Sequence, residues 1–115
     1  MEQNPGPHLK RVLLSVIAGA QQDGATDLVM VPAGGEGTSW RYNVGGTWHD
    51  SPPSPMLQWP VVVSELAGLA GIRDASYPKE GIIYVAYSGV RLRWQLKMAS
   101  QDNECVLHKL GSDTI

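Results

Sequence analysis

Hydrophobic residues recur with two different periods along this chain. Near the N-terminus, six apolar residues at helical spacing predict a helix of about four turns with one apolar stripe. These residues are Leu9, Val12, Leu13, Val16, Ile17 and Ala20. Gly24 is placed to end this helix. A second stripe over 61–70 favours another core-facing helix with Pro60 in its first turn, although the β-branched run from Val61 weakens this prediction.

Period-two alternation predicts strands in the rest of the chain. The clearest strand spans 90–98, where every second residue is large and apolar and the residues between them are charged or polar. The other predicted strands are 27–31, 39–44, 82–87 and 105–109. Glycine-containing segments at 33–37, 45–46 and 88–89 have the composition of tight turns, so we expect hairpins at these points.

Prolines shape the middle of the chain and complete the fold prediction. The run from Ser51 to Pro55 contains three prolines, which lack the N–H that a strand ladder needs, so we expect a surface linker into the second helix. The order is then helix, two or three strands, helix, three strands. Short connections favour antiparallel pairing, and two amphipathic helices can cover one face of the sheet. The pattern therefore predicts an α/β (α+β) two-layer sandwich, with a single domain over 8–110 and flexible ends at 1–7 and 111–115.

Composition and charge exclude several classes of function. The 115 residues are 43% hydrophobic and 17% charged, which is typical of one folded domain. A net charge of −2 argues against binding nucleic acid, which needs a surplus of clustered Lys and Arg. The N-terminus has no signal-peptide pattern and no apolar run approaches the ~20 residues that span a bilayer, so we expect a cytoplasmic protein without membrane insertion. The single cysteine, Cys105, excludes an intrachain disulfide and is expected to act as a small apolar residue on a strand.

No motif indicates catalysis or cofactor binding. The three histidines have no second ligand at close spacing, so we expect no metal site. The segment from Gly34 to Gly37 lacks the Lys and Ser/Thr of a phosphate-binding loop, and we interpret it as a hairpin turn. There is no nucleophile-elbow motif, although a triad assembled in space stays open. The 90–98 strand carries a basic row, which is either a solvated face or a site for an anionic partner: Arg91, Arg93 and Lys97.

Five motifs in order resemble one protein family. The run Gly24-Ala25-Thr26-Asp27-Leu28-Val29-Met30-Val31-Pro32 is similar to the family's Gly-Ala-Ser-Asp-Ile-His-Ile-Glu-Pro. The run Arg41-Tyr42-Asn43-Val44-Gly45-Gly46 is similar to Arg-Tyr-Arg-Ile-Asp-Gly. Further similarities follow in Leu66-Ala67-Gly68-Leu69, in Tyr77-Pro78-Lys79-Glu80-Gly81, and in Leu92-Arg93-Trp94 with Val106-Leu107-His108-Lys109-Leu110. From Leu9 to Leu110 the chain thus resembles the domain that precedes the RecA-like motor in type II secretion and type IV pilus assembly ATPases, which implies a PAS-like α/β sandwich.

The resemblance also implies what the domain lacks and what it could contact. ATP hydrolysis in the family needs a RecA-like domain with a phosphate loop, so we expect this chain not to be an enzyme by itself. In the family this domain lends arginines to phosphates held by the motor domain; Arg41 matches one of them and Arg93 is a second nucleotide-proximal candidate. Asn43 replaces the other arginine of the pair, and Val29 and Val31 replace the His and Glu of the first strand. Whether the chain is a divergent relative or a piece of a longer ATPase stays open.

Three functions are compatible with these features. The leading hypothesis is a non-catalytic interaction module that packs against itself, as a homo-oligomer, or against another component of a secretion or pilus assembly. Its candidate contact residues are Val29, Val31, Trp40 and Trp59, with core packing as the alternative for each. The second hypothesis is a regulatory domain whose Arg41 and Arg93 reach ATP bound on a separate motor domain. The third is a PAS-like sensor of a small ligand, for which the sequence has no cofactor signature, so we expect no cofactor.

Overall fold

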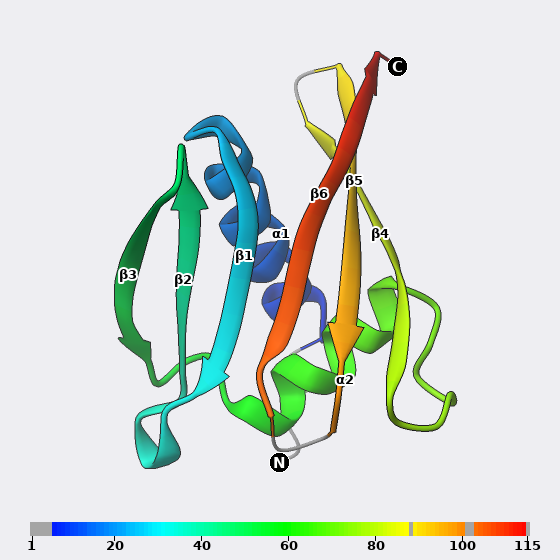
Figure 1. Ribbon diagram of the computed structural model, residues 1–115. Helices are drawn as coiled ribbons and strands as arrows, with labels where there is room; N and C mark the ends of the chain where they lie inside the picture. The colour runs from blue at the N-terminus through cyan, green and yellow to red at the C-terminus, as the bar shows by residue number, and fades with distance from the viewer. Residues whose placement is uncertain (1–5, 88, 101–102, 115) are drawn as a thin grey trace.

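Two helices and six strands form the computed structural model, which describes residues 6–87, 89–100 and 103–114. Each helix is followed by three strands (Figure 1). The elements are α1 (Gly6–Gln22), β1 (Ala25–Pro32), β2 (Thr38–Val44), β3 (Thr47–Ser54), α2 (Trp59–Leu69), β4 (Lys79–Tyr87), β5 (Val90–Met98) and β6 (Cys105–Thr114), with a short 3-10 turn at Gly34–Glu36 between β1 and β2. The predicted helices and strands are therefore confirmed, with bounds shifted by a few residues.

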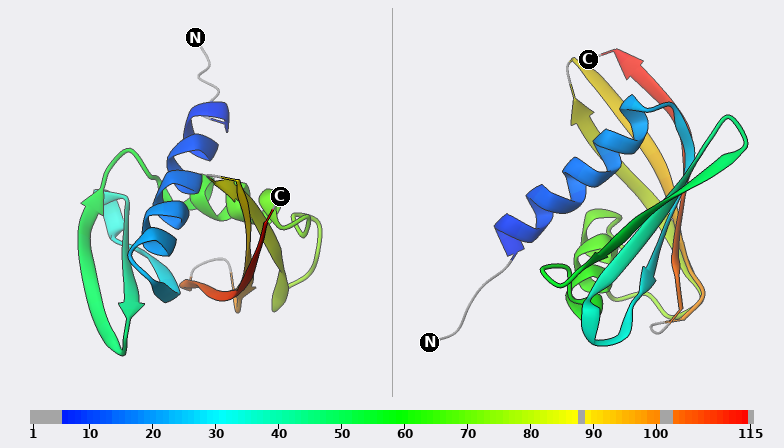
Figure 2. Two further views of the ribbon diagram at one scale, coloured as in Figure 1. Left: turned by 90° about the horizontal axis from the view of Figure 1, so that it is seen from above. Right: turned by 90° about the vertical axis from the view of Figure 1, so that its left-hand side faces the viewer.

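The six strands form one antiparallel sheet in the order β3-β2-β1-β6-β5-β4. The last strand in the chain, β6, lies between β1 and β5 and so joins the strands that precede α2 to those that follow it (Figure 1). Both helices lie on the same face of this sheet (Figure 2). The predicted two-layer α+β architecture is confirmed.

The core lies between the helices and the covered face of the sheet. From Leu92 onwards, every second residue of β5 is at most 3% exposed: Leu92, Trp94, Leu96 and Met98. The predicted helix stripes supply the other side, with Leu13 and Ile17 from α1 and Val62 and Leu66 from α2 all fully buried. Burial of this apolar surface is the main stabilising term for the fold. None of the helices in the described part of the chain is long and apolar enough to cross a membrane.

Cys105 belongs to this core as expected. Its side chain is 1% exposed at the start of β6. Burial raises the pKa of the Cys105 thiol to about 12, and the negative charge of Glu104 adds to the effect. The thiol therefore stays protonated at neutral pH and packs as an apolar group.

The turn between β2 and β3 is built as the sequence predicted. Gly45 and Gly46 have φ values of 58° and 89°, a left-handed conformation that glycine adopts without a steric penalty. The side-chain oxygen of Asn43 accepts a hydrogen bond from the backbone N–H of Gly46 at 2.9 Å. These contacts fix the hairpin connection.

The expected linker from Ser51 to Pro55 is wrong for most of its length. The strand β3 continues through Pro52 and Pro53 to Ser54, and Ser51 and Ser54 pair with Trp40 and Thr38 of β2. The register shifts between these two pairs, which is where the prolines lie. An edge strand needs backbone donors on one side only, so it accepts prolines that a central strand could not.

Both ends of the regular structure extend beyond the expected domain limits. Helix α1 already begins at Gly6, inside the stretch 1–7 that was expected to be flexible. Strand β6 continues to Thr114, and 111–114 pairs with 90–93 of β5, where a tail was expected. Pairing with a full-length neighbour explains the longer strand. The remaining terminal residues, 1–5 and 115, lie outside the described residues.

Candidate functional site: the open face of the sheet

The face of the sheet opposite the helices, called the open face here, has no helix or strand of the described residues packed over it (Figure 2). One row of paired residues crosses it from edge to edge, with one residue from each of the six strands. The row is Asp50, Arg41, Val29, Val106, Lys97 and Glu80. Carboxylates therefore lie at both ends of the row, cations lie next to them, and two valines lie in the middle.

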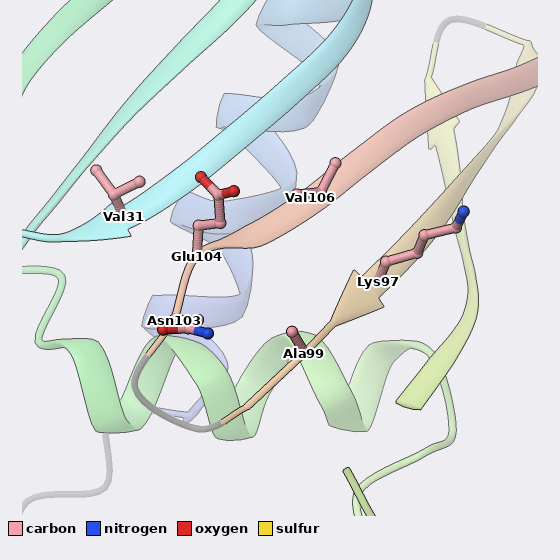
Figure 3. Close-up of a pocket in the computed structure, with 6 residues that line it drawn as sticks. All are labelled: Val31, Lys97, Ala99, Asn103, Glu104 and Val106. Atoms are coloured by element: carbon pink, nitrogen blue, oxygen red, sulfur yellow. The ribbon is translucent and has the colours of Figure 1, made fainter. Parts of the chain in front are cut away.

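The valines form an apolar centre on this face. Val29 is only 5% exposed, and its neighbours Val106 and Val31 are half-buried. Val31 and Val106 line a shallow pocket of about 430 Å³ together with Lys97, Ala99, Asn103 and Glu104 (Figure 3). The pocket thus has an apolar wall and a rim that carries both a cation and a carboxylate, a combination suited to hold an apolar side chain of a partner.

A polar pair lies beside the valines. His108 of β6 and Asp27 of β1 are cross-strand partners, and His108 Nδ1 is 2.8 Å from Asp27 Oδ1. The Thr26 hydroxyl donates to the other carboxylate oxygen of Asp27 at 2.8 Å. Partial burial by itself would raise the pKa of Asp27, but the hydrogen bonds from His108 and Thr26 and the charge of His108 outweigh it and lower that pKa. Asp27 is therefore held as a carboxylate on the open face.

The two candidate arginines lie on the open face but far apart. Arg41 is exposed on β2, with its guanidinium carbon 5.2 Å from the centre of the Trp48 ring. Arg93 is half-buried on β5, close to the backbone of Gly111. The strands β1 and β6 lie between them, so the arginines are separated by at least three strand spacings, about 14 Å. They do not converge on a site the size of one phosphate group.

The two candidate tryptophans lie on the other side of the sheet or in the core. Trp40 alternates with Arg41 on β2, so it faces the helix side, where it is half-buried against the core. Trp59 is the first residue of α2 and is 9% exposed within the core cluster. Both tryptophans therefore pack in or against the core, which was the alternative to a contact role. Val29 and Val31, in contrast, lie on the open face.

Sequence reasoning missed Val106 and the pairing of Asp27 with His108. Both depend on β6 lying next to β1, a contact between residues about eighty positions apart that no local pattern encodes. The local pattern of alternating apolar residues near Cys105 predicted a strand at 105–109, but it did not predict which strands lie next to it in the sheet.

No protein-family model matches this sequence, and no curated protein matches it significantly. The resemblance to secretion and pilus ATPases therefore stays a prediction.

Proposed function

We propose that this domain is a non-catalytic interaction module of a secretion or pilus type of assembly, and that the centre of its open face docks a partner protein. The observation that carries the proposal is the apolar centre formed by Val29, Val31 and Val106 on the face of the sheet that the two helices do not cover. Protein interfaces commonly combine such an apolar centre with a polar, solvated rim.

The charges beside the valines define the chemistry of the partner. Arg41 and Lys97 flank the valine pair on either side, about 14 Å apart across three strand spacings. A matching surface offers an apolar side chain for the pocket and carboxylates on both sides of it. The resemblance supports the same surface, because Val29 and Val31 stand where the family has His and Glu.

The test measures binding of the domain to a RecA-like secretion or pilus motor domain from the same organism, by isothermal titration calorimetry. Val31→Asp and Val106→Asp each put a carboxylate into the pocket, and we expect each to weaken binding roughly tenfold or more. The matched control is Ser64→Asp, which adds the same charge at an exposed position of α2 on the opposite side of the molecule.

Circular dichroism of each variant checks that the fold is retained. Unchanged affinity of both pocket variants would contradict docking on the open face. An equal loss for Ser64→Asp would attribute the effect to charge alone and contradict it as well.

The second candidate function is regulation of ATP hydrolysis on a separate motor domain by Arg41. The observation that favours it is the exposed guanidinium of Arg41, which stacks on Trp48 and is thereby ordered before it meets a ligand. If Arg41 reaches the phosphates, Arg41→Ala lowers the ATPase rate of the mixed domains while their binding affinity is kept. The matched control is Arg11→Ala at an exposed position of α1, on the other side of the sheet from Arg41, which leaves the rate unchanged.

A further inference from the structure

The sheet ends in two edge strands of opposite character. A free edge carries unpaired backbone N–H and C=O groups that can pair with another strand, and prolines, bulges or charges normally prevent this. The edge strand β3 contains Pro52 and Pro53 and a register shift against β2. The other edge strand, β4, has none of these protections along its middle, where the residues from Gly81 to Ala86 are all uncharged.

The strand β4 is long and regular. It pairs with β5 over nine consecutive residues without a register shift. In the described part of the chain, no backbone hydrogen bond outside the helices and strands involves a residue of β4. Two large side chains of this edge are exposed on the open face, Ile82 at 38% and Tyr84 at 56%. The outer edge of β4 is thus a template for a further strand.

The helix layer leaves the middle and the end of this edge accessible, whereas the segment 70–78, which leads from α2 into β4, lies beside its start (Figure 1). A groove of about 430 Å³ lies between α1 and β4, and the small residues Ser15, Ala18 and Gly19 line its helix side together with Arg11, Leu14 and Gln22. A Cβ atom added to Gly19 would meet nothing within 4 Å. Near the start of β4, the segment around Ile72 packs against Gly81, on the helix side of the strand. An added strand beside the middle of β4 therefore has room.

We propose that β4 pairs antiparallel with β4 of a second copy of this chain, which joins two six-stranded sheets into one. Ile83 is the middle residue of β4, so a two-fold axis at Ile83 gives the longest overlap. In this register Ile82 of each copy lies opposite Tyr84 of the other on the open face. The two exposed apolar side chains of the edge then cover each other as a cross-strand pair.

Charge also favours this register. Glu80 lies opposite Ala86 of the second copy, and Ala86 is paired in its own sheet with Arg91 of β5. Glu80 and Arg91 of the two copies are then two strand spacings apart, about 10 Å between Cα atoms, with only the small Ala86 between them. Arg91 already leans over this edge, because its guanidinium carbon lies 5.9 Å from the centre of the Tyr84 ring. The two-fold axis makes this approach of Glu80 to Arg91 occur twice.

This inference deepens the proposed function, because it names one partner and one surface of the assembly module. It rests on that function only in treating the domain as such a module. The two surfaces differ: the docking centre lies over β1 and β6, and the self-pairing surface is the β4 edge. Failure of either can therefore be measured separately.

The first test is light scattering coupled to size exclusion across a concentration series of the whole chain. We expect a concentration-dependent dimer for the wild type. Ile82→Lys and Tyr84→Lys each place a charge at the seam, and each should weaken dimerisation roughly tenfold or more. The matched control is Trp48→Lys on the β3 edge, a side chain that is also exposed, at 46%, and its dimer should be unchanged.

The second test uses charge reversal between copies. Glu80→Arg and Arg91→Glu should each leave a weakened dimer, and an equimolar mixture of the two variants should recover it, because each seam contact then joins opposite charges. Within one copy the two residues lie six positions apart along the ladder, about 20 Å, so the recovery cannot arise inside a chain.

A wild type that stays monomeric at every concentration overturns the inference, and so does a mixture that dimerises no better than its separate components. Either result leaves docking on the open face to be decided by the Val31→Asp and Val106→Asp titrations.

Discussion

The two halves of the sheet are held in place by different means. Strands β1, β6, β5 and β4 lie under the helices, and the inward side chains of β5 are at most 3% exposed. The hairpin of β2 and β3 extends beyond the helices (Figure 2), and no residue of β3 is fully buried. One half therefore depends on a packed core, whereas the hairpin contributes only the half-buried Trp40 and Tyr42 of β2 to that core.

Local geometry adds to this limited packing in the hairpin. The backbone of Gly37, at the entry to β2, lies directly against the backbone of Ser54, at the end of β3. The Asn43 side chain bonds to the turn, and the rings of Tyr42 and His49 stack with centroids 5.3 Å apart. The difference teaches that one continuous sheet can combine a half stabilised by burial with a half stabilised by turn chemistry and cross-strand pairs.

The largest expected effect is in the packed half. Trp94→Ala removes a fully buried indole from the middle of β5 and should cost about 3–5 kcal/mol of unfolding free energy, because a cavity remains where the ring packed. The comparison variant is Trp48→Ala on β3, where the ring is 46% exposed and stacks under Arg41, and the loss should be about 0.5–1 kcal/mol. Urea unfolding of both proteins measures the difference. Equal losses of unfolding free energy in the two variants would contradict the conclusion that core burial stabilises one half more than the other.

The next effect should be in the hairpin half. Gly37 has a φ of 92°, and an added Cβ atom would collide with the backbone carbonyl of Ser54. Gly37→Ala should therefore cost at least about 1–3 kcal/mol, the usual cost of a strained backbone, even though it removes no buried atom.

The control for this prediction is Gly35→Ala, two residues earlier in the same turn. An added Cβ atom there meets nothing within 4 Å, and its φ is not in the left-handed region. Thermal unfolding should separate the two variants clearly. A Gly37→Ala protein as stable as Gly35→Ala would mean that the close approach to Ser54 does not hold the hairpin.

The same contrast explains how much of the fold the sequence could predict. The bounds of β5 were predicted to the residue, because one strand face is buried and the other is not, which imposes strict alternation from Val90 to Met98. The strand β3 was left open as a possible third strand without bounds, and its proline-containing end was predicted as a linker, because prolines rule out a central strand but not an edge strand. Its position at the edge is a property of the whole sheet that local pattern does not contain.

The candidate site could be predicted only in part for a related reason. Val29 and Val31 were singled out because apolar residues stood where the resembled family has polar ones. Their neighbour Val106 belongs to β6, and its position beside β1 follows from the order of strands in the folded sheet. Pairing of distant segments is decided by the packing of the complete core, so the apolar centre became visible only in three dimensions.

The smallest expected effect lies where the packed half meets the hairpin half. Asp27 of β1 lies between Asn43 of β2 and His108 of β6, and its pKa is lowered from the ordinary value of 3.8. A carboxyl group with a lowered pKa in the folded protein stabilises it above the unfolded pKa, and this stabilisation is lost as the pH falls through the folded pKa. Below about pH 4, wild-type stability should therefore fall more steeply than that of Asp27→Asn.

His108→Gln tests the cause of the shift, because it removes the imidazole that holds the carboxylate. We expect the stability of this variant to fall less steeply below about pH 4 than that of the wild type, as for Asp27→Asn. The difference in unfolding free energy should be about 0.2–1 kcal/mol, because the His108 side chain is 55% exposed. Urea unfolding at a series of pH values from neutral into the acid range measures both variants. If His108→Gln kept the full acid dependence of the wild type, the pairing of β1 with β6 at the border of the packed half would rest on the backbone ladder alone, with no measurable part for this side-chain pair.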